Sequence, residues 1–313
     1  MNRSLTCVLL PILAAAVGGC APMDVYRSHL LPTGNQAEPG VFVTWLGTAG
    51  VLVSDGTTGI LIDPYVSRSG LCRVIFGMKL HPDRDLIRQW VARTGSVPIR
   101  AVVVSHSHFD HALDAPFFAR ETGAPLVGSR STRNIGLGAG LPETQLMTVQ
   151  PGRTMALGAF TLTFLESAHG PALFGRVPYP GTISEPLIPP RPAGDYRLGT
   201  TFSILITHPC GTILHHGSAG FVTGMYAGVR SDVVLLGITG RGDTGEYLAQ
   251  VPLQVKARTL IPIHFDDFFH PLGEGLSFLY TSRFAEFCAT AGESGLAVRT
   301  LPVGEQVRVL PVE

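Results

Sequence analysis

The chain has 313 residues, of which 45% are hydrophobic and 15% are charged. Its 23 basic and 23 acidic side chains give a formal net charge of zero. These values are typical of a globular protein with a large core, and the absence of a basic block argues against nucleic acid as a partner.

The first 20 residues predict a lipoprotein signal peptide. Arg3 supplies a positive start, and the apolar stretch over 5–17 is shorter than the roughly 20 residues that a membrane-spanning helix needs. The segment Val17-Gly18-Gly19-Cys20 resembles the bacterial lipobox, in which the cysteine becomes the lipidated first residue of the mature protein. An ordinary signal peptide with an incidental cysteine is the alternative.

A lipobox implies a location in the bacterial cell envelope. The protein would be anchored through Cys20, on the outer side of the cytoplasmic membrane or in the periplasm. We then expect residues 1–20 to be the signal peptide, 21–40 to be a tether, and 41–313 to be the folded domain. The membrane is therefore an expected partner.

The cysteines beyond the N-terminal segment do not form a recognisable framework. Cys72, Cys210 and Cys288 are odd in number and contain no CxxC pair. One disulfide could form in an oxidising compartment, but the sequence does not indicate which two would pair.

Apolar runs separated by glycine-rich turns predict a series of strands from residue 41 onward. Several runs are continuously apolar, which is typical of strands covered on both faces of a sheet. The expected strands begin at residues 41, 50, 59, 100, 160, 200, 211, 232 and 259. Helical patterns fall at 82–94, 113–122, 246–256 and 279–292. Strands with helices outside them predict an α/β layered sandwich in a single domain.

Residues 171–192 contain seven prolines and follow directly on His169. Proline fixes φ and removes a backbone donor, so we expect an ordered loop without regular structure. A loop of this length in a compact domain is often functional. It is therefore predicted to be a lid over a site.

A cluster of polar side chains follows the apolar run at 101–104. His106 and His108 are two residues apart in an extended chain, so both side chains can point the same way. Asp110 and His111 follow at the start of the next predicted helix. Such groups are costly to hold together without a bound ion, and they suit Zn²⁺, with Fe or Mn as alternatives.

Two further histidines close predicted strands. His169 ends "TFLESAH" and His264 ends "LIPIH", so each lies where a strand gives way to a loop, as His106 does. A lone histidine after a strand is more often a simple surface residue. Three strand ends with the same pattern favour a shared metal site.

The segment HSHFDH at 106–111 matches the HxHxDH motif of the metallo-β-lactamase superfamily. The segments "WLGTAGVLV" and "GILIDP" resemble the opening strands of its metal-dependent hydrolase branch, which includes lactonases and phospholipases that cleave N-acyl-phosphatidylethanolamines. The match extends over roughly 41–270. It implies a four-layer αββα sandwich, and it is specific for the fold rather than for the substrate.

The resemblance also implies how the ligands divide between two ions. One ion would be held by His106, His108 and His169, and a second by Asp110, His111 and His264. Asp63 falls at a family motif, where it would orient a ligand histidine. Its alternative role is that of a turn residue before Pro64.

Members of this superfamily normally add an aspartate that bridges the two ions. At the corresponding place this chain reads Gly217-Ser218-Ala219-Gly220, and serine lacks the negative charge. The chain would therefore hold one or two Zn²⁺ ions, with the second site weaker. His215 or His216 could compensate, as could Asp266 or Asp267, and the sequence does not choose among them.

The resemblance implies a metal-dependent hydrolase that uses an activated water on an ester, lactone, amide or phosphodiester. Asp110 would orient the water and accept a proton, and His216 or His270 would return one to the leaving group. A non-catalytic metal- or ligand-binding lipoprotein on the same fold is the alternative, and a β-lactamase is a further one. A serine hydrolase is disfavoured because His216 stands where the G-x-S-x-G elbow around Ser218 needs glycine.

Aromatic and apolar side chains near these positions favour a small-molecule or lipid-like substrate. They are Leu173, Phe174, Tyr179, Phe265, Phe268 and Phe269. Ordinary core packing would explain the same residues, so the sequence does not specify the bond that is cleaved.

Overall fold

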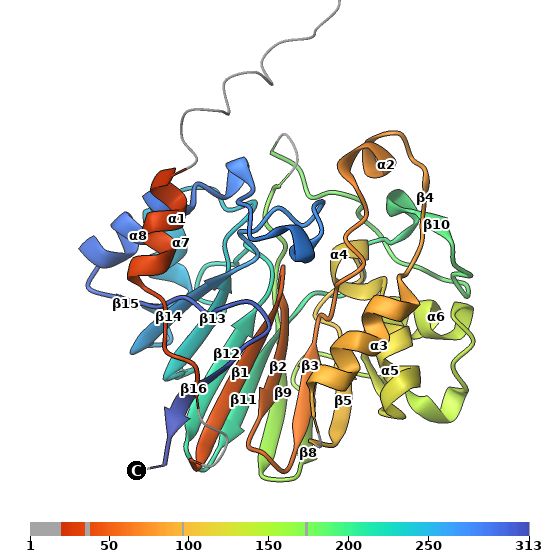
Figure 1. Ribbon diagram of the computed structural model, residues 1–313, viewed down its shortest axis with the longest axis horizontal. Coiled ribbons are helices and arrows are strands. Elements are labelled where there is room, and N and C mark those ends of the chain that lie inside the picture. The colour runs from red at the N-terminus through yellow and green to blue at the C-terminus, as the bar shows by residue number, and fades with distance from the viewer. Residues whose placement is uncertain (1–19, 35–37, 96, 173–174, 313) are drawn as a thin grey trace, which may run out of the picture.

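The computed structural model describes residues 20–34, 38–95, 97–172 and 175–312 (Figure 1). The expected signal peptide lies outside these residues, except for Cys20. Among the described residues, no helix combines the length and the apolar character that crossing a membrane requires.

Two seven-stranded sheets form the centre of the molecule. The first has the order β16-β1-β2-β3-β5-β6-β7, antiparallel from β16 to β3 and parallel from β3 to β7. Its strands are β16 (Gln306–Pro311), β1 (Gly40–Gly47), β2 (Gly50–Ser54), β3 (Gly59–Ile62), β5 (Ile99–Val103), β6 (Leu126–Gly128) and β7 (Leu146–Thr148).

The second sheet has the order β15-β14-β13-β12-β11-β9-β8. Its strands are β15 (Ala297–Val298), β14 (Thr259–Ile263), β13 (Val233–Gly237), β12 (Gly211–His216), β11 (Phe202–His208), β9 (Phe160–Glu166) and β8 (Thr154–Leu157). The strands from β12 to β15 are parallel and those from β8 to β12 are antiparallel.

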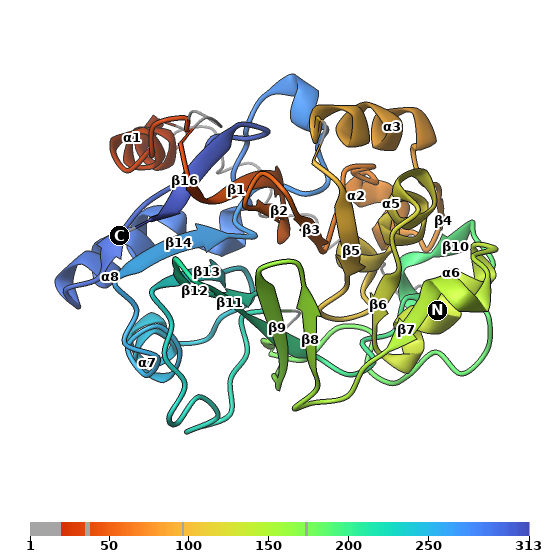
Figure 2. The same cartoon turned by 90° about the horizontal axis from the view of Figure 1, so that it is seen from below.

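Helices cover the outer face of each sheet, so the four-layer αββα sandwich is confirmed (Figure 2). The first sheet is covered by α3 (Arg84–Arg93), α5 (Ala115–Thr122) and α6 (Arg130–Gly138), and the second by α1 (Cys20–Ser28), α7 (Thr244–Gln250) and α8 (Phe284–Glu293). Two short helices, α2 (Leu71–Ile75) and α4 (Phe109–Ala112), lie toward the upper end of the molecule in Figure 1.

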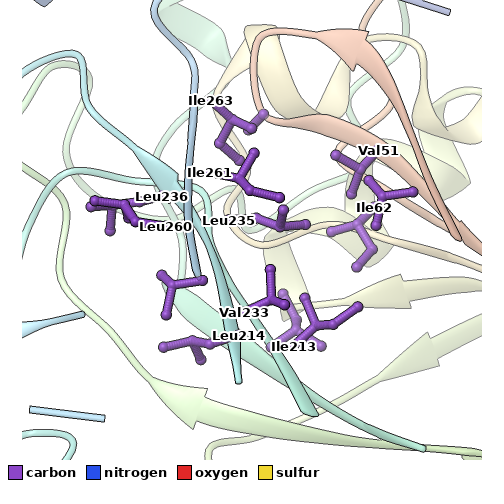
Figure 3. Packing of buried hydrophobic residues seen from close by; sticks show 14 of the residues in the cluster. Val51, Ile62, Ile213, Leu214, Val233, Leu235, Leu236, Leu260, Ile261 and Ile263 are labelled. Carbon is purple, nitrogen blue, oxygen red and sulfur yellow. The ribbon is translucent and has the colours of Figure 1, made fainter. Parts of the chain in front are cut away.

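The main core lies between the two sheets. Figure 3 shows Val51 and Ile62 of the first sheet facing Leu235 and Ile261 of the second. Leu236 is also fully buried although it alternates with Leu235, because helices cover the outer face of its sheet. The continuously apolar runs in the sequence therefore correspond to strands buried on both sides.

Local sequence signals explain how α3 and α5 begin and end. The side chain of Asp83 accepts a hydrogen bond from the Leu86 amide at 2.9 Å and caps α3. Ile87 and Trp90, three residues apart, form its buried face. The helix α5 ends at Gly123, which adopts the left-handed conformation that favours glycine.

The segment expected to be a tether is folded at its start. Residues 20–28 form α1, and the buried Tyr26 donates a hydrogen bond from its hydroxyl to the Leu301 carbonyl at 2.7 Å. The Thr300 hydroxyl donates to the Tyr26 carbonyl at 2.7 Å. The folded domain therefore begins well before residue 41, and a helix with one deeply buried aromatic residue explains why its sequence pattern was too weak to predict it.

The proline-rich segment is irregular, as expected, and its described part is firmly attached. The Asn134 side chain donates to the Ile183 carbonyl at 2.7 Å, and Ile183 and Leu187 are buried. A short strand β10 (Arg191–Pro192) pairs with β4 (Lys79–Leu80). The predicted lid is thus tied both to α6 and to the segment that follows α2.

The three cysteines that follow α1 in the described chain do not pair. Cys72 is exposed, Cys210 is half-buried and Cys288 is buried, and all three are free thiols.

Candidate metal centre

Polar side chains from three strand ends meet at one end of the sandwich. His106 and His108 follow β5, His169 follows β9, and His264 follows β14. His108 lies just before α4, so Asp110 and His111 occupy the first turn of that helix. All six side chains are buried except that of His169, which is half-buried.

The side chains form the two groups that the resemblance implied. One contains His106, His108 and His169, and the other contains Asp110, His111 and His264, with the potential ligand atoms of each group within 4.8 Å of one another. The groups are adjacent, because the rings of His106 and His111 lie 3.9 Å apart between centroids.

The residues present fit a metal ion. The Nε2 atom of His106 is buried and has no hydrogen-bond partner among the described residues. Other ligand histidines have one nitrogen held by the backbone: His108 Nε2 lies 2.9 Å from the Pro178 carbonyl oxygen, and His169 Nδ1 lies 2.7 Å from that of Gly170. A buried nitrogen atom without a partner is costly unless an ion binds it, so His106 Nε2 fits a metal ligand.

The electrostatics of the groups also suit a cation. Burial and the neighbouring His169 lower the pKa of His108 to about 3, and burial lowers the pKa of His169 to about 4. Burial alone would raise the pKa of Asp110, but His111 and His264 lower it below its usual range. Near neutral pH His108 and His169 are therefore neutral imidazoles and Asp110 is an ionised carboxylate, which are the forms that bind metals.

Asp63 makes the contacts that its motif suggested. It is fully buried, and its carboxylate accepts hydrogen bonds from the Ser105 amide at 2.6 Å and the Ser105 hydroxyl at 2.5 Å. Its Oδ2 atom lies 2.9 Å from Nδ1 of His111. Asp63 thus orients a histidine of the second group rather than serving only as a turn residue.

His216 does not take part in the site, so its predicted role as a proton donor to the leaving group is wrong. The ring is fully buried, with Nδ1 2.7 Å from both the Ser203 and the Tyr226 hydroxyl. Its neighbour His215 points the other way, and its Nε2 lies 2.8 Å from the Ala49 carbonyl oxygen. Neither histidine belongs to the two candidate metal-binding groups of the described chain.

Asp266 is not free to replace the bridging carboxylate. It forms a buried ion pair with Arg68 at 2.7 Å and accepts a hydrogen bond from the Thr48 amide at 2.9 Å. Asp267 is paired with His270 at 2.6 Å near the surface. The sequence offers no signal for the Arg68 partnership, because 198 residues separate the two side chains.

Ser218 occupies a buried position beside the first group. Its hydroxyl donates to the Ala168 carbonyl at 3.3 Å, next to His169 in the chain. No histidine is hydrogen-bonded to this hydroxyl among the described residues, so the serine hydrolase alternative lacks a base. Asp110 is the only carboxylate in the two groups.

Only some of the aromatic side chains that were expected near the site lie there. Phe268 packs 5.2 Å from the His264 ring and 4.3 Å from the Phe269 ring. Phe265 instead lies in the main core, 4.9 Å from Trp45. Tyr179 of the lid lies 6.1 Å from the His108 ring, whereas Leu173 and Phe174 lie outside the described residues.

Comparison with known proteins agrees with this geometry. Residues 43–237 match the metallo-β-lactamase superfamily, and the chain belongs to that superfamily. A UPF0173 metal-dependent hydrolase from Myxococcus xanthus is 26% identical over 283 residues, which cover 89% of this chain and 88% of the relative. A second one, from Pyrobaculum islandicum, is 26% identical over 230 residues, covering 72% of this chain and 84% of the relative.

Solved structures share the fold at low identity. The metallo hydrolase Igni18 from Ignicoccus hospitalis has a TM-score of 0.54 and 19% identity, covering 85% of this chain and 97% of that protein. CmlA, a diiron β-hydroxylase from Streptomyces venezuelae, has a TM-score of 0.50 and 14% identity, covering 87% of this chain and 54% of that protein. The resemblance to the lactonase and phospholipase branch stays a prediction.

Proposed function

We propose that this metal-dependent hydrolase of the metallo-β-lactamase superfamily attacks an ester, lactone, amide or phosphodiester bond with water. The observation that carries the proposal is the pair of adjacent ligand groups, His106, His108 and His169 beside Asp110, His111 and His264. Each group would hold one divalent ion. When bound, such an ion lowers the pKa of a water molecule and polarises the bond under attack.

The donor set favours zinc without specifying it. Neutral imidazole and carboxylate ligands are typical of Zn²⁺, and iron and manganese bind the same atoms. CmlA, which has a related fold, is a diiron enzyme, so iron stays a candidate. Since Ser218 brings no charge, we infer that binding of one ion leaves the second ion more weakly bound.

Two side chains of this chain would handle protons. Asp110, ionised at neutral pH, would orient the attacking water and accept its proton at a carboxylate oxygen. With His216 away from the site, we assign the contact with the substrate's leaving group to the Tyr179 hydroxyl. Burial and Asp110 raise the pKa of Tyr179, which keeps this hydroxyl protonated and able to donate.

We further propose a small-molecule or lipid-like substrate and a location in the bacterial cell envelope. The lid with Tyr179 and the neighbouring Phe268 supports an apolar substrate. The lipobox ending at Cys20 supports a lipid anchor on the outer side of the cytoplasmic membrane or in the periplasm.

The first experiment is metal analysis by mass spectrometry on protein purified without chelators, followed by hydrolysis assays on esters, lactones, amides and phosphodiesters. His108→Ala should lose both metal and hydrolysis. His81→Ala, at an exposed histidine, should lose neither. Absence of metal from the wild type, even after addition of zinc, iron or manganese, would contradict the proposal.

A non-catalytic metal-binding lipoprotein is the second candidate, and Ser218 in place of the bridging aspartate favours it. The same experiment separates the two. Stoichiometric metal without hydrolysis of any of the four substrate classes would identify a binding protein.

A further inference from the structure

A short apolar segment lies toward the upper end of the molecule in Figure 1. It comprises residues 71–79, which include α2, and no residue of this helix is buried. Ile75 is 66% exposed and Phe76 is 76% exposed, and Leu71 and Met78 are each 47% exposed. Single exposed apolar residues are common on protein surfaces. Four within nine residues indicate a surface that binds a membrane or another apolar surface.

The segment is held in this projecting position by its own hydrogen bonds. The Phe76 amide donates to the Cys72 carbonyl at 3.0 Å, and the Met78 amide donates to the Arg73 carbonyl at 2.8 Å. Before it, the Ser69 amide donates to the Tyr65 hydroxyl at 2.7 Å. After it, β4 pairs with β10 of the lid. The apolar side chains are therefore displayed on a folded scaffold anchored at both ends.

The charges of the segment are of one sign. Arg73 and Lys79 are its charged residues, both exposed, and there is no acidic residue between 70 and 80. Exposed apolar side chains flanked by cations are suited to the interface of a membrane that contains anionic lipids.

The position of the segment agrees with the expected anchor. Figure 1 places α2 at the upper end of the molecule. The first residue of α1, the lipobox Cys20, lies toward the same end. The helix α4, which carries Asp110 and His111, lies in the same upper half. The start of α1, where the anchor is expected, the projecting segment and α4 therefore lie in the same upper half of Figure 1.

We propose that residues 71–79 insert into the surface of an anionic lipid bilayer. Phe76 and Ile75 would enter the boundary between headgroups and acyl chains, while Arg73 and Lys79 contact lipid phosphates. Because β4 joins this segment to the lid, insertion would turn the lid and the metal centre toward the membrane. The inference is independent of the proposed hydrolysis, since it concerns binding alone.

Tryptophan fluorescence of the full chain in vesicles tests the inference. The chain has two tryptophans, Trp45 and Trp90, and both are buried, so a third one at the surface can be monitored separately. In Phe76→Trp, we expect the emission to shift to shorter wavelength in vesicles of phosphatidylglycerol and phosphatidylethanolamine. Lipids brominated on their acyl chains should quench it.

The matched control is Val312→Trp, at an exposed residue near the C-terminus, which lies at the lower end in Figure 1. Its emission should not change. Adding Arg73→Glu and Lys79→Glu to Phe76→Trp should abolish most of the quenching. The inference would be overturned by equal quenching of the two tryptophan variants or by quenching that survives the charge reversal. A shift that brominated lipids do not quench would overturn it as well, because the tryptophan of Phe76→Trp would then not reach the acyl chains.

Discussion

His111 and Asp63, 48 positions apart in the chain, are joined by a buried contact of 2.9 Å between Nδ1 and Oδ2. Burial lowers the pKa of His111, but Asp63 and Asp110 offset this and leave it raised. A proton on Nδ1 is therefore stabilised, which leaves Nε2 to face the candidate metal centre. Such a contact sets the tautomer and the ring orientation of a ligand.

Asp63→Asn should weaken metal binding while leaving the shape of the site intact. The amide nitrogen of asparagine cannot accept the proton of His111 Nδ1, so the preferred tautomer is lost. We expect affinity for zinc to fall by about 10- to 100-fold, measured by competition with a chelator of known affinity. Asp243→Asn, at the exposed cap of α7, is the control and should bind zinc as the wild type does. Equal affinities in the two variants would contradict this role.

The ion pair of Arg68 and Asp266 supports the loop that carries His264. Both side chains are about 1% exposed. Asp266 accepts from the Thr48 amide, and the Thr48 carbonyl accepts from the His264 amide at 2.8 Å. Arg68→Met leaves a buried carboxylate without its cation, so we expect the free energy of unfolding to fall by about 3 to 5 kcal/mol in urea titrations.

Two variants control for this effect. Arg308→Met removes a partner from the surface pair with Glu38, whose side chain is 52% exposed, and should cost at most about 1 kcal/mol. Adding Asp266→Asn to Arg68→Met removes the unpaired charge and should restore part of the loss. The cost of Asp266→Asn is measured as the loss in free energy of unfolding, once in the wild type and once in Arg68→Met. If the two losses are equal, the two side chains are not coupled.

His216 makes the fold sensitive to acid. Burial, and then the charge of His215, lowers the pKa of His216 from 6.5 to about 3. The folded state thus excludes a proton that the unfolded chain binds below pH 6.5. This contribution to stability is complete above pH 6.5 and is lost as the pH falls toward 3.

His216→Asn should reduce that dependence. The asparagine oxygen can accept a hydrogen bond from Ser203 or Tyr226, and the residue does not titrate. Between pH 6 and pH 4, we expect the free energy of unfolding to fall less steeply than in the wild type, by up to about 1.4 kcal/mol per pH unit. Urea unfolding at several pH values measures this, with the exposed His81→Asn as control. An unchanged slope would show that His216 does not titrate on unfolding.

The sequence predicted the parts of the fold and site that depend on local spacing. Continuously apolar runs identified the buried strands, and HSHFDH placed four potential ligands at one strand end. His169 and His264 followed from the shared position after a strand. These features depend on neighbouring residues, so they can be recognised without knowing the register of the sheets.

Features that depend on distant packing were not predictable. The alternation of β12 shows that His215 and His216 face opposite sides, but only the contacts with Ser203 and Tyr226 show where His216 points. Asp266 looked available because Arg68 is remote in sequence. The start of the domain was missed because α1 is held by Tyr26 and the distant Leu301.

Ser218→Asp tests whether the charge of the site limits its metal content. In the wild type, Asp110 is the only carboxylate among the two ligand groups, so a second divalent ion adds charge that is poorly compensated. The Ser218 hydroxyl donates to the Ala168 carbonyl at 3.3 Å. An aspartate there would repel this oxygen unless a cation lies between them.

We therefore expect Ser218→Asp to bind the second ion on the order of tenfold or more tightly than the wild type, by calorimetric zinc titration. Without metal, the variant should unfold at lower urea concentration than the wild type, and with metal the order should reverse. Ser184→Asp, in the exposed part of the lid, adds the same charge away from the site and should change neither quantity. Two ions bound with equal affinity by the wild type and Ser218→Asp would mean that another group already supplies the missing charge.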